Sequence, residues 1–152
     1  DVSAILDLMI HDIDLALAIS AADPVTAEGE GTKSSDGVWD IARAEVSFED
    51  GFTALFDVSR QAAARNRTMK IVYPSGELEI DFVARTLRNT TPFALNADYA
   101  ETPAGRDPLG ASVEGFLAAV RGKAPRPIVT AEEAIRALDF ELAVEQALGD
   151  PS

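Results

Sequence analysis

The hydrophobic pattern of this 152-residue chain changes its period twice, and this change constrains the fold more than any other feature. Residues 4–20 carry apolar side chains at helical spacing. Residues 25–91 then alternate with a period of two, which is typical of half-buried strands, and residues 108–148 return to the helical period. The sequence therefore predicts one helix that is buried on most sides, a group of strands, and two closing helices.

Six strands are predicted in the central region. Glycine stands in the turns 49–51 and 74–76, where hairpins favour a positive φ. In the third strand, Phe56 and its apolar neighbours alternate with polar residues such as Thr53 and Asp57, which is typical of an antiparallel sheet that is covered on one face. The predicted strands span residues 25–33, 41–49, 52–59, 68–73, 77–83 and 86–90.

The predicted helices can cover that apolar face. We predict an α+β two-layer sandwich, with a predominantly antiparallel open sheet of about six strands and helices on one face, formed by residues 1–152 as a single domain. Ser3 and the capping box Thr130-Ala-Glu-Glu133 are expected to begin the first and last helices. The residues expected to cover the sheet are Phe116, Leu117 and Val120 on one helix and Ile135, Leu138, Leu142 and Val144 on the other.

The composition excludes several classes of function. Thirteen Lys and Arg residues against 26 Asp and Glu residues give a net charge of −13, so nucleic acid and anionic membranes are poor partners. The absence of cysteine excludes disulfides, thiolate metal sites and cysteine nucleophiles. No run approaches the ~20 apolar residues that a membrane-spanning helix needs, and we expect a cytoplasmic protein.

The first residues suggest that the chain is a piece of a longer protein. It opens on Asp1 and enters an apolar run almost at once, whereas natural termini are more often polar. A deliberately shortened expression product would begin in the same way.

Three polar residues of the first predicted helix form a narrow stripe. Asp7, His11 and Asp14 are spaced i, i+4 and i+7, within about 60° of arc on an ideal helix. A histidine beside a carboxylate is the usual pair for general acid–base chemistry near neutral pH, and His11 is the only histidine of the chain. A self-satisfied structural Asp–His pair would give the same pattern. The spacing supplies too few ligands for a metal site.

Other sequence features point less directly to chemistry. Arg60 and Arg65 follow a predicted strand and are candidates for contact with an anionic substrate group, although such arginines often only offset a negative surface. Gly29-Glu30-Gly31 lacks the third glycine and the following helix of a phosphate-binding loop.

Four segments resemble the C-terminal domain of Gfo/Idh/MocA-type oxidoreductases, in the same order and at similar spacing over nearly the whole chain. The first is similar to the D-x-x-x-H-x-x-D-L stretch that opens this domain, although Met9 stands where the family often has glycine, which alters the wall beside the Asp–His pair. The segments are residues 7–15 (DLMIHDIDL), 76–81 (GELEID), 107–109 (DPL) with 116–117 (FL), and 129–134 (VTAEEA).

The resemblance implies the substrate-binding half of a dehydrogenase. Its Rossmann domain, which carries the Glu-Lys-Pro segment and binds NAD or NADP, would precede this chain, so we expect the fragment alone to bind no cofactor and to be inactive. His11 would take the proton of a secondary alcohol on a sugar or polyol-like substrate, and Asp7 would orient His11 or the hydroxyl. The alternative is a non-catalytic binding or assembly module of the same fold.

Self-association is the last expectation from the sequence. The helices leave one sheet face uncovered, and its mixture of charged, polar and small apolar residues can pair with a second copy across a two-fold axis. In the family this face commonly forms the subunit interface, which implies a homodimer or tetramer.

Overall fold

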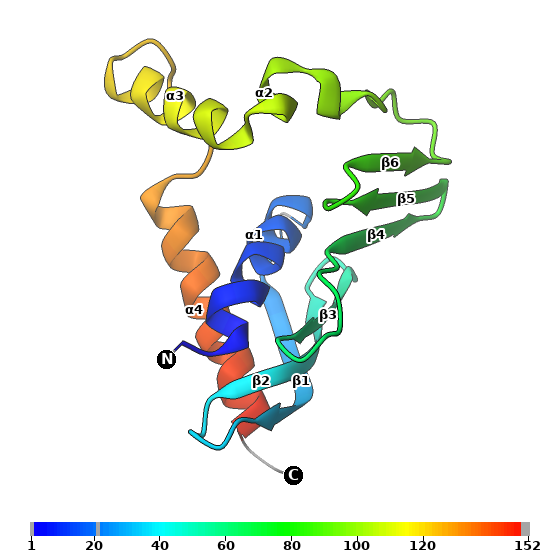
Figure 1. Cartoon of the computed structure of the whole chain (residues 1–152), viewed down its shortest axis with the longest axis vertical. Helices are drawn as coiled ribbons and strands as arrows, with labels where there is room; N and C mark the ends of the chain where they lie inside the picture. The colour runs from blue at the N-terminus through cyan, green and yellow to red at the C-terminus, as the bar shows by residue number, and fades with distance from the viewer. Residues whose placement is uncertain (1, 21, 150–152) are drawn as a thin grey trace. The chain divides into compact units, whose positions relative to one another are not determined.

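The computed structural model describes residues 2–20 and 22–149, and these fall into two compact units (Figure 1). Unit 1 consists of the described residues up to 62 and from 129 onward. Unit 2 is Ala63–Ile128. Each unit contains antiparallel strands and helices, so the predicted α+β class is confirmed.

Unit 1 begins with a helix and closes with another. Ser3 Oγ accepts a hydrogen bond from Leu6 N, and Thr130 and Glu133 exchange the two hydrogen bonds of a capping box, so both predicted helix starts are confirmed. The elements are the π-helical turn η1 (Ile5–Met9), α1 (Ile10–Ile19), β1 (Pro24–Lys33), β2 (Trp39–Phe48), β3 (Thr53–Ser59) and α4 (Ala131–Gly149).

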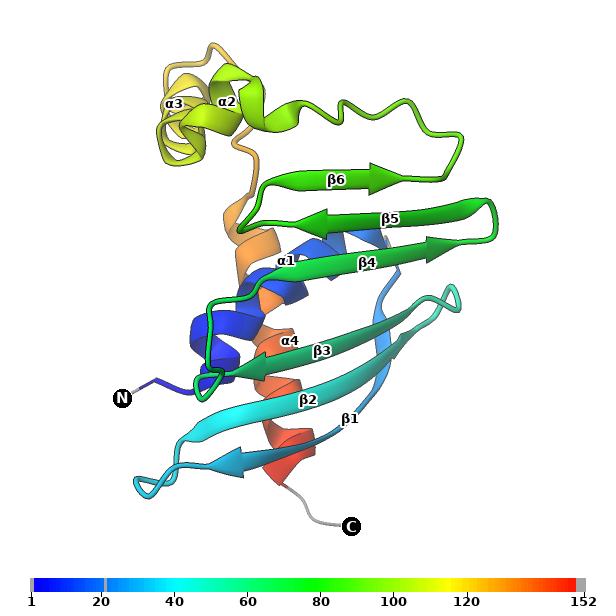
Figure 2. The ribbon, with the colours of Figure 1, turned by 45° about the vertical axis from the view of Figure 1, so that its right-hand side comes forward.

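The core of unit 1 lies between its sheet and its helices. Figure 2 shows η1, α1 and α4 on one side of the β1-β2-β3 sheet. Alternate residues of β3 are buried there, as predicted, and the Phe48 ring packs edge-on against Phe140 of α4 at 6.0 Å between centroids. Burial of each large apolar side chain stabilises the fold by about 1.5–3 kcal/mol. The helical contribution comes from Ile5, Met9, Ile13 and Ala16 and from Ala137, Phe140, Val144 and Leu148.

The Gly29-x-Gly31 pair has a steric role in β1. A Cβ atom on Gly29 would lie 2.4 Å from the Arg43 carbonyl oxygen and 3.2 Å from the Leu148 side chain. The two glycines therefore let α4 approach β1 closely, which accounts for them without a phosphate-binding loop.

Unit 2 contains the other three strands. They form an antiparallel sheet in which Leu78 is the only buried hydrophobic residue of the unit. The elements are β4 (Thr68–Tyr73), β5 (Gly76–Asp81), β6 (Thr86–Asn89), the 3-10 turn η2 (Tyr99–Glu101), α2 (Pro103–Arg106) and α3 (Pro108–Val120).

The six predicted strands are all present, and they form two three-stranded sheets instead of one continuous sheet. Residues 60–67, which join β3 to β4, are too many for the tight hairpin turn that would pair these two strands directly, and strand pairing is found within each unit.

The predicted role of several helical residues in the core is wrong. No residue of α3 is buried, and Phe116 and Val120 are 57% and 67% exposed. On α4 the buried side is the one that carries Ala137 and Phe140, which leaves Ile135, Leu138 and Leu142 exposed. Apolar spacing alone does not tell which of two adjacent helix faces meets the sheet.

None of the helices in residues 2–20 and 22–149 is both long enough and apolar enough to span a lipid bilayer.

Candidate active site

The helix that carries the candidate site is buried on one face only. Its core stripe runs through Ile5, Met9 and Ile13, while Asp7 and His11 are exposed and Asp14 is half-buried. The expectation of a helix buried on most sides is therefore wrong, and the polar side chains lie on its solvent side.

Asp7 lies in a wide helical turn. The backbone N–H of Ile10 donates to the carbonyl of Ile5, which is the i to i+5 pattern of a π-helix. The ideal α-helical spacing used to align Asp7 with His11 does not hold across this turn. Short π-helical segments occur frequently at functional sites, but no sequence signal here predicted this one.

Arg60 is the partner of Asp7. Its Nη2 donates to Asp7 Oδ2 at 3.0 Å and to the Ser3 carbonyl oxygen at 3.5 Å. Arg60 follows β3 directly, and its own backbone N–H donates to the Asp40 carbonyl at 2.9 Å. This Asp7–Arg60 ion pair joins η1 to the end of β3, and sequence analysis had placed Arg60 only as a candidate substrate contact.

The His11 imidazole is open to a ligand. In the described part of the chain its side chain forms no hydrogen bond and no ion pair, and none joins it to Asp7. Asp14 likewise has no side-chain partner among these residues. An exposed imidazole without a partner can accept or donate a proton to a bound substrate.

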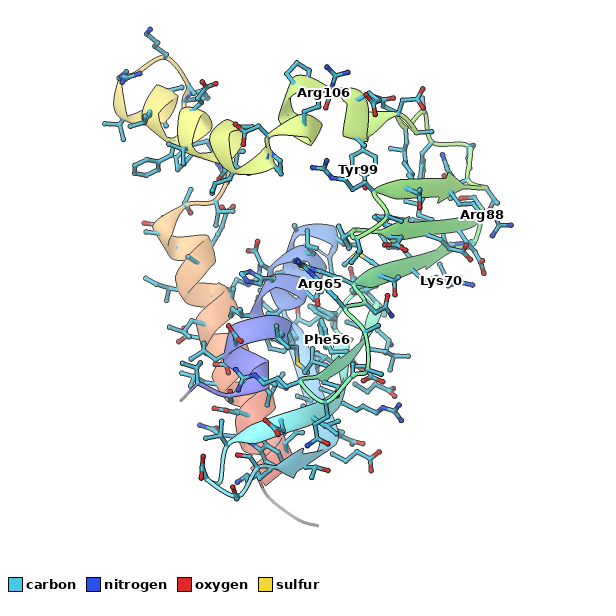
Figure 3. All side chains as sticks on the ribbon, in the orientation of Figure 1. Phe56, Arg65, Lys70, Arg88, Tyr99 and Arg106 are labelled. Atoms are coloured by element: carbon cyan, nitrogen blue, oxygen red, sulfur yellow. The ribbon has the colours of Figure 1, made fainter. Side chains whose placement is uncertain are left out.

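Arg65 is not part of this group in unit 1. It is exposed, is labelled in Figure 3, and belongs to unit 2. Its contact with a substrate stays a prediction.

Metal chemistry receives no support from the side chains. Within residues 2–20 and 22–149, no group of three or more His, Cys, Asp or Glu residues could hold a metal ion.

Glu141 is a buried carboxyl that sequence analysis missed. It is 0% exposed on α4, and neither carboxyl oxygen has a hydrogen-bond partner among the described residues. Burial, together with the charge of Glu145, raises the pKa of the Glu141 carboxyl from 4.5 to about 7. No sequence signal identified it, because the apolar spacing of α4 does not show which face of the helix meets the sheet.

We expect the Glu141→Gln variant of this chain to gain stability relative to the wild type as the pH rises from 4.5 to 7. The raised pKa in the folded state means that the neutral acid favours folding below pH 4.5, and that this contribution is lost as the pH rises through 7. The relative gain is about 3 kcal/mol at most. Urea unfolding of both proteins across this range measures it.

Glu132→Gln, which removes an exposed carboxylate from the same helix, controls for the loss of one negative charge. A stability difference between Glu141→Gln and wild type that does not change between pH 4.5 and pH 7 would contradict a neutral buried Glu141.

The polar face of each sheet carries ion pairs within the chain. Arg43 Nε donates to Asp57 Oδ2 at 2.8 Å in unit 1. In unit 2, Lys70 and Arg88, labelled in Figure 3, pair with Glu77 and Glu79 at 2.8 and 3.1 Å. The basic residues thus have acidic partners in their own sheet, and Leu55, at 75% exposed, is the large apolar side chain on this face of unit 1.

A known protein with a similar sequence is a dehydrogenase. The chain is 33% identical over 132 residues to the UDP-N-acetylglucosamine 3-dehydrogenase of Acidithiobacillus ferrooxidans, in a match that covers 82% of this chain and 42% of that protein. The chain thus spans about half the length of such relatives.

Solved structures show the same fold. A structure of UDP-N-acetylglucosamine 3-dehydrogenase GnnA from A. ferrooxidans matches with a TM-score of 0.81 and 28% identity, over 97% of this chain and 48% of that one. The Bordetella pertussis WlbA dehydrogenase, solved in complex with NADH and UDP-GlcNAcA, matches with a TM-score of 0.78 and 15% identity, over 99% of this chain and 46% of that one. At this low identity the second match shows the fold alone.

The sequence profile of the GFO/IDH/MocA C-terminal domain matches residues 2–79. This match covers half of the chain and includes Asp7, His11 and Arg60. The family resemblance found in the sequence is confirmed, and the chain belongs to the Gfo/Idh/MocA oxidoreductase family as its C-terminal domain.

Proposed function

We propose that this chain is the substrate-binding domain of an NAD(P)-dependent dehydrogenase that acts on a secondary alcohol of a sugar, with a nucleotide sugar as the first substrate class to test. The observation that carries the proposal is the exposed His11 imidazole, free of partners among the described residues and four positions after Asp7. The names of the similar dehydrogenases support the sugar-nucleotide class.

His11 would act as the general acid–base. It would accept the proton of the substrate hydroxyl during oxidation and return it during reduction. Asp7 would stabilise the protonated imidazole or orient the hydroxyl, because its charge is opposite to that of the imidazolium. Asp14 and Arg65 stay candidate substrate contacts, whereas Arg60 contacts Asp7.

The described residues do not fit a dinucleotide. Gly29 and Gly31 lie inside β1 against α4 and β2, away from any strand-to-helix turn that could hold a pyrophosphate. We therefore expect an N-terminal Rossmann domain to hold NAD or NADP, the reaction's hydride carrier, while this domain handles the substrate and its proton. The cytoplasmic location stays a prediction.

A non-catalytic binding or assembly module is the second candidate. The Asp7–Arg60 ion pair favours it, because a carboxylate that ties η1 to the end of β3 can serve the fold alone. Under this alternative, His11 is an ordinary exposed residue.

The full-length protein is expected to reduce NAD or NADP when it is given a nucleotide sugar such as UDP-N-acetylglucosamine. Absorbance at 340 nm across a panel of nucleotide sugars and free sugars measures this turnover. The present chain alone, titrated calorimetrically with NADH and NADPH, is expected to show no specific binding at sub-millimolar concentration, because it lacks a dinucleotide site among its described residues.

A full-length protein that is inactive with every sugar of the panel would favour the binding module. Tight binding of NADH to the present chain would contradict the assignment of the cofactor site to another domain.

We further propose that the uncovered face of the β1-β2-β3 sheet forms a two-fold interface. The exposed Leu55 supports this, since stable interfaces are apolar and depleted of charge at their centre. The Arg43–Asp57 ion pair beside it is already neutralised. The same face also carries exposed carboxylates that would need basic partners from the second copy, namely those of Glu28, Glu30 and Glu45. The expected assembly is a homodimer, or a tetramer built from it.

A further inference from the structure

Hydrogen bonds hold both the backbone and the side chain of Arg60. Its backbone N–H donates to the Asp40 carbonyl oxygen, and the neighbouring Gln61 Nε2 donates to the Asp40 carboxylate at 3.2 Å. Its side chain, 30% exposed, reaches the Ser3 carbonyl and the Asp7 carboxylate with one nitrogen, Nη2. The Arg60 side chain is therefore less exposed than the Asp7 side chain that it contacts, which is 56% exposed, and it has a second acceptor in the Ser3 carbonyl.

Asp7 has no comparable restraint of its own. It lies in the π-helical turn, and an exposed carboxylate samples several rotamers unless a partner holds it. The contact with Arg60 occupies Oδ2, and Oδ1 has no side-chain partner among the described residues. One oxygen is thus fixed and the other is available to a second group.

We propose that Arg60 is a positioning residue, which acts on the reaction by holding Asp7 in the orientation that serves His11 and the substrate hydroxyl, and that it is not an anion-binding ligand of the substrate. This inference rests on the proposed dehydrogenase function. It gives Arg60, the residue that follows β3, a role in the candidate site on η1 and α1. Asp7 of that site lies 53 positions away in the sequence.

The energetics give this role a distinct signature. An exposed ion pair contributes little to stability, so loss of Arg60 should leave the melting temperature almost unchanged. A misplaced catalytic group, by contrast, can lower the rate by about 100-fold. A large loss of kcat without a loss of stability is therefore the expected result.

The chain provides a closely matched control. Arg136 also donates from Nη2 to a carboxylate and to a backbone carbonyl, namely Asp23 Oδ1 at 2.7 Å and the Ala22 oxygen at 2.8 Å. This pair joins α4 to the start of β1 and includes neither His11 nor Asp7. Arg136→Gln therefore removes the same kind of interaction from the same unit.

The test is a double-mutant cycle in the full-length enzyme, with kcat, KM and melting temperature measured for each variant. Arg60→Gln is expected to lower kcat by about 10- to 100-fold, with KM changed by less than about threefold. In the Asp7→Asn background the same change should have almost no further effect, because a residue that acts through Asp7 has nothing left to position. Arg60→Lys should recover part of the rate, and Arg136→Gln should retain it.

Two results would overturn the positioning role of Arg60, and a third would overturn the function on which it rests. If Arg60→Gln lowers kcat by the same factor in the wild-type and the Asp7→Asn background, and also raises KM, Arg60 is a direct substrate ligand. A lowered melting temperature with unchanged kcat would make the Asp7–Arg60 ion pair structural. If the wild-type enzyme shows no turnover, the proposed function itself is wrong. The assay of the unmutated protein is done first and identifies that case.

Discussion

Replacement of His11 by alanine in the full-length protein is expected to lower kcat by about 10²–10⁴-fold, the range for loss of a positioned general acid–base. His11 is exposed, and its side chain forms no hydrogen bond or ion pair with the described residues. Its loss should therefore hardly change the melting temperature. Affinity for NADH should also be unchanged, since the cofactor is expected on another domain. Steady-state kinetics, calorimetric titration and thermal unfolding measure these quantities.

A second variant separates proton transfer from polarity. His11→Gln keeps a polar side chain of similar size but cannot serve as a base near neutral pH, so it should be as slow as His11→Ala. If His11→Gln retains wild-type turnover, or if His11→Ala retains it and lowers the melting temperature by many degrees, the acid–base role is wrong.

The Leu55→Arg substitution is expected to convert a dimer into a monomer. Leu55 is 75% exposed on the uncovered face of β3, opposite Glu45 of β2, and a guanidinium there would put a charged pair, which resists desolvation, in place of the apolar side chain of a two-fold interface. Light scattering at micromolar concentration should give twice the 16.1 kDa chain mass for the wild type and the single chain mass for Leu55→Arg.

Leu109→Arg is the matched control for this experiment. Leu109 is 76% exposed, like Leu55, but lies on α3 in unit 2 and is not a residue of the β1-β2-β3 sheet. A wild-type chain that is monomeric in both the isolated and the full-length protein would contradict the interface, and so would loss of the dimer in Leu109→Arg as readily as in Leu55→Arg.

Local sequence rules predicted the elements of this fold well, because those elements depend on neighbouring residues. The six strands lie within about two residues of their predicted bounds, and the cap at Ser3 and the capping box at Thr130 form the expected hydrogen bonds. The buried side of β3 was also predicted correctly, since a period of two leaves only two faces to choose between.

Features that depend on distant contacts were not predictable in the same way. The Asp7–Arg60 ion pair joins residues 53 positions apart, and only the fold brings them together. Val144 is buried as predicted, but the rest of the predicted faces of α3 and α4 were misassigned, because apolar side chains such as Phe116 and Leu138 are exposed although their spacing resembles that of core residues. Hydrophobic spacing shows that a helix has an apolar face but does not identify what covers it.

The candidate site was predicted as a set of residues but not as a geometry. His11 and Asp7 lie close in sequence on one helical segment, so their shared location followed from spacing alone. The π-helical turn and the exposure of both side chains did not follow, because spacing rules assume an ideal α-helix and carry no information on solvent access.

A crystal structure of the full-length protein with NAD(P) and a nucleotide sugar would test the central claim most directly. The account predicts a His11 imidazole nitrogen about 2.6–3.2 Å from the hydroxyl whose carbon faces the nicotinamide, with the Asp7–Arg60 ion pair intact beside it. A reacting hydroxyl that lies beyond hydrogen-bond reach of His11, directly or through one water molecule, would contradict it.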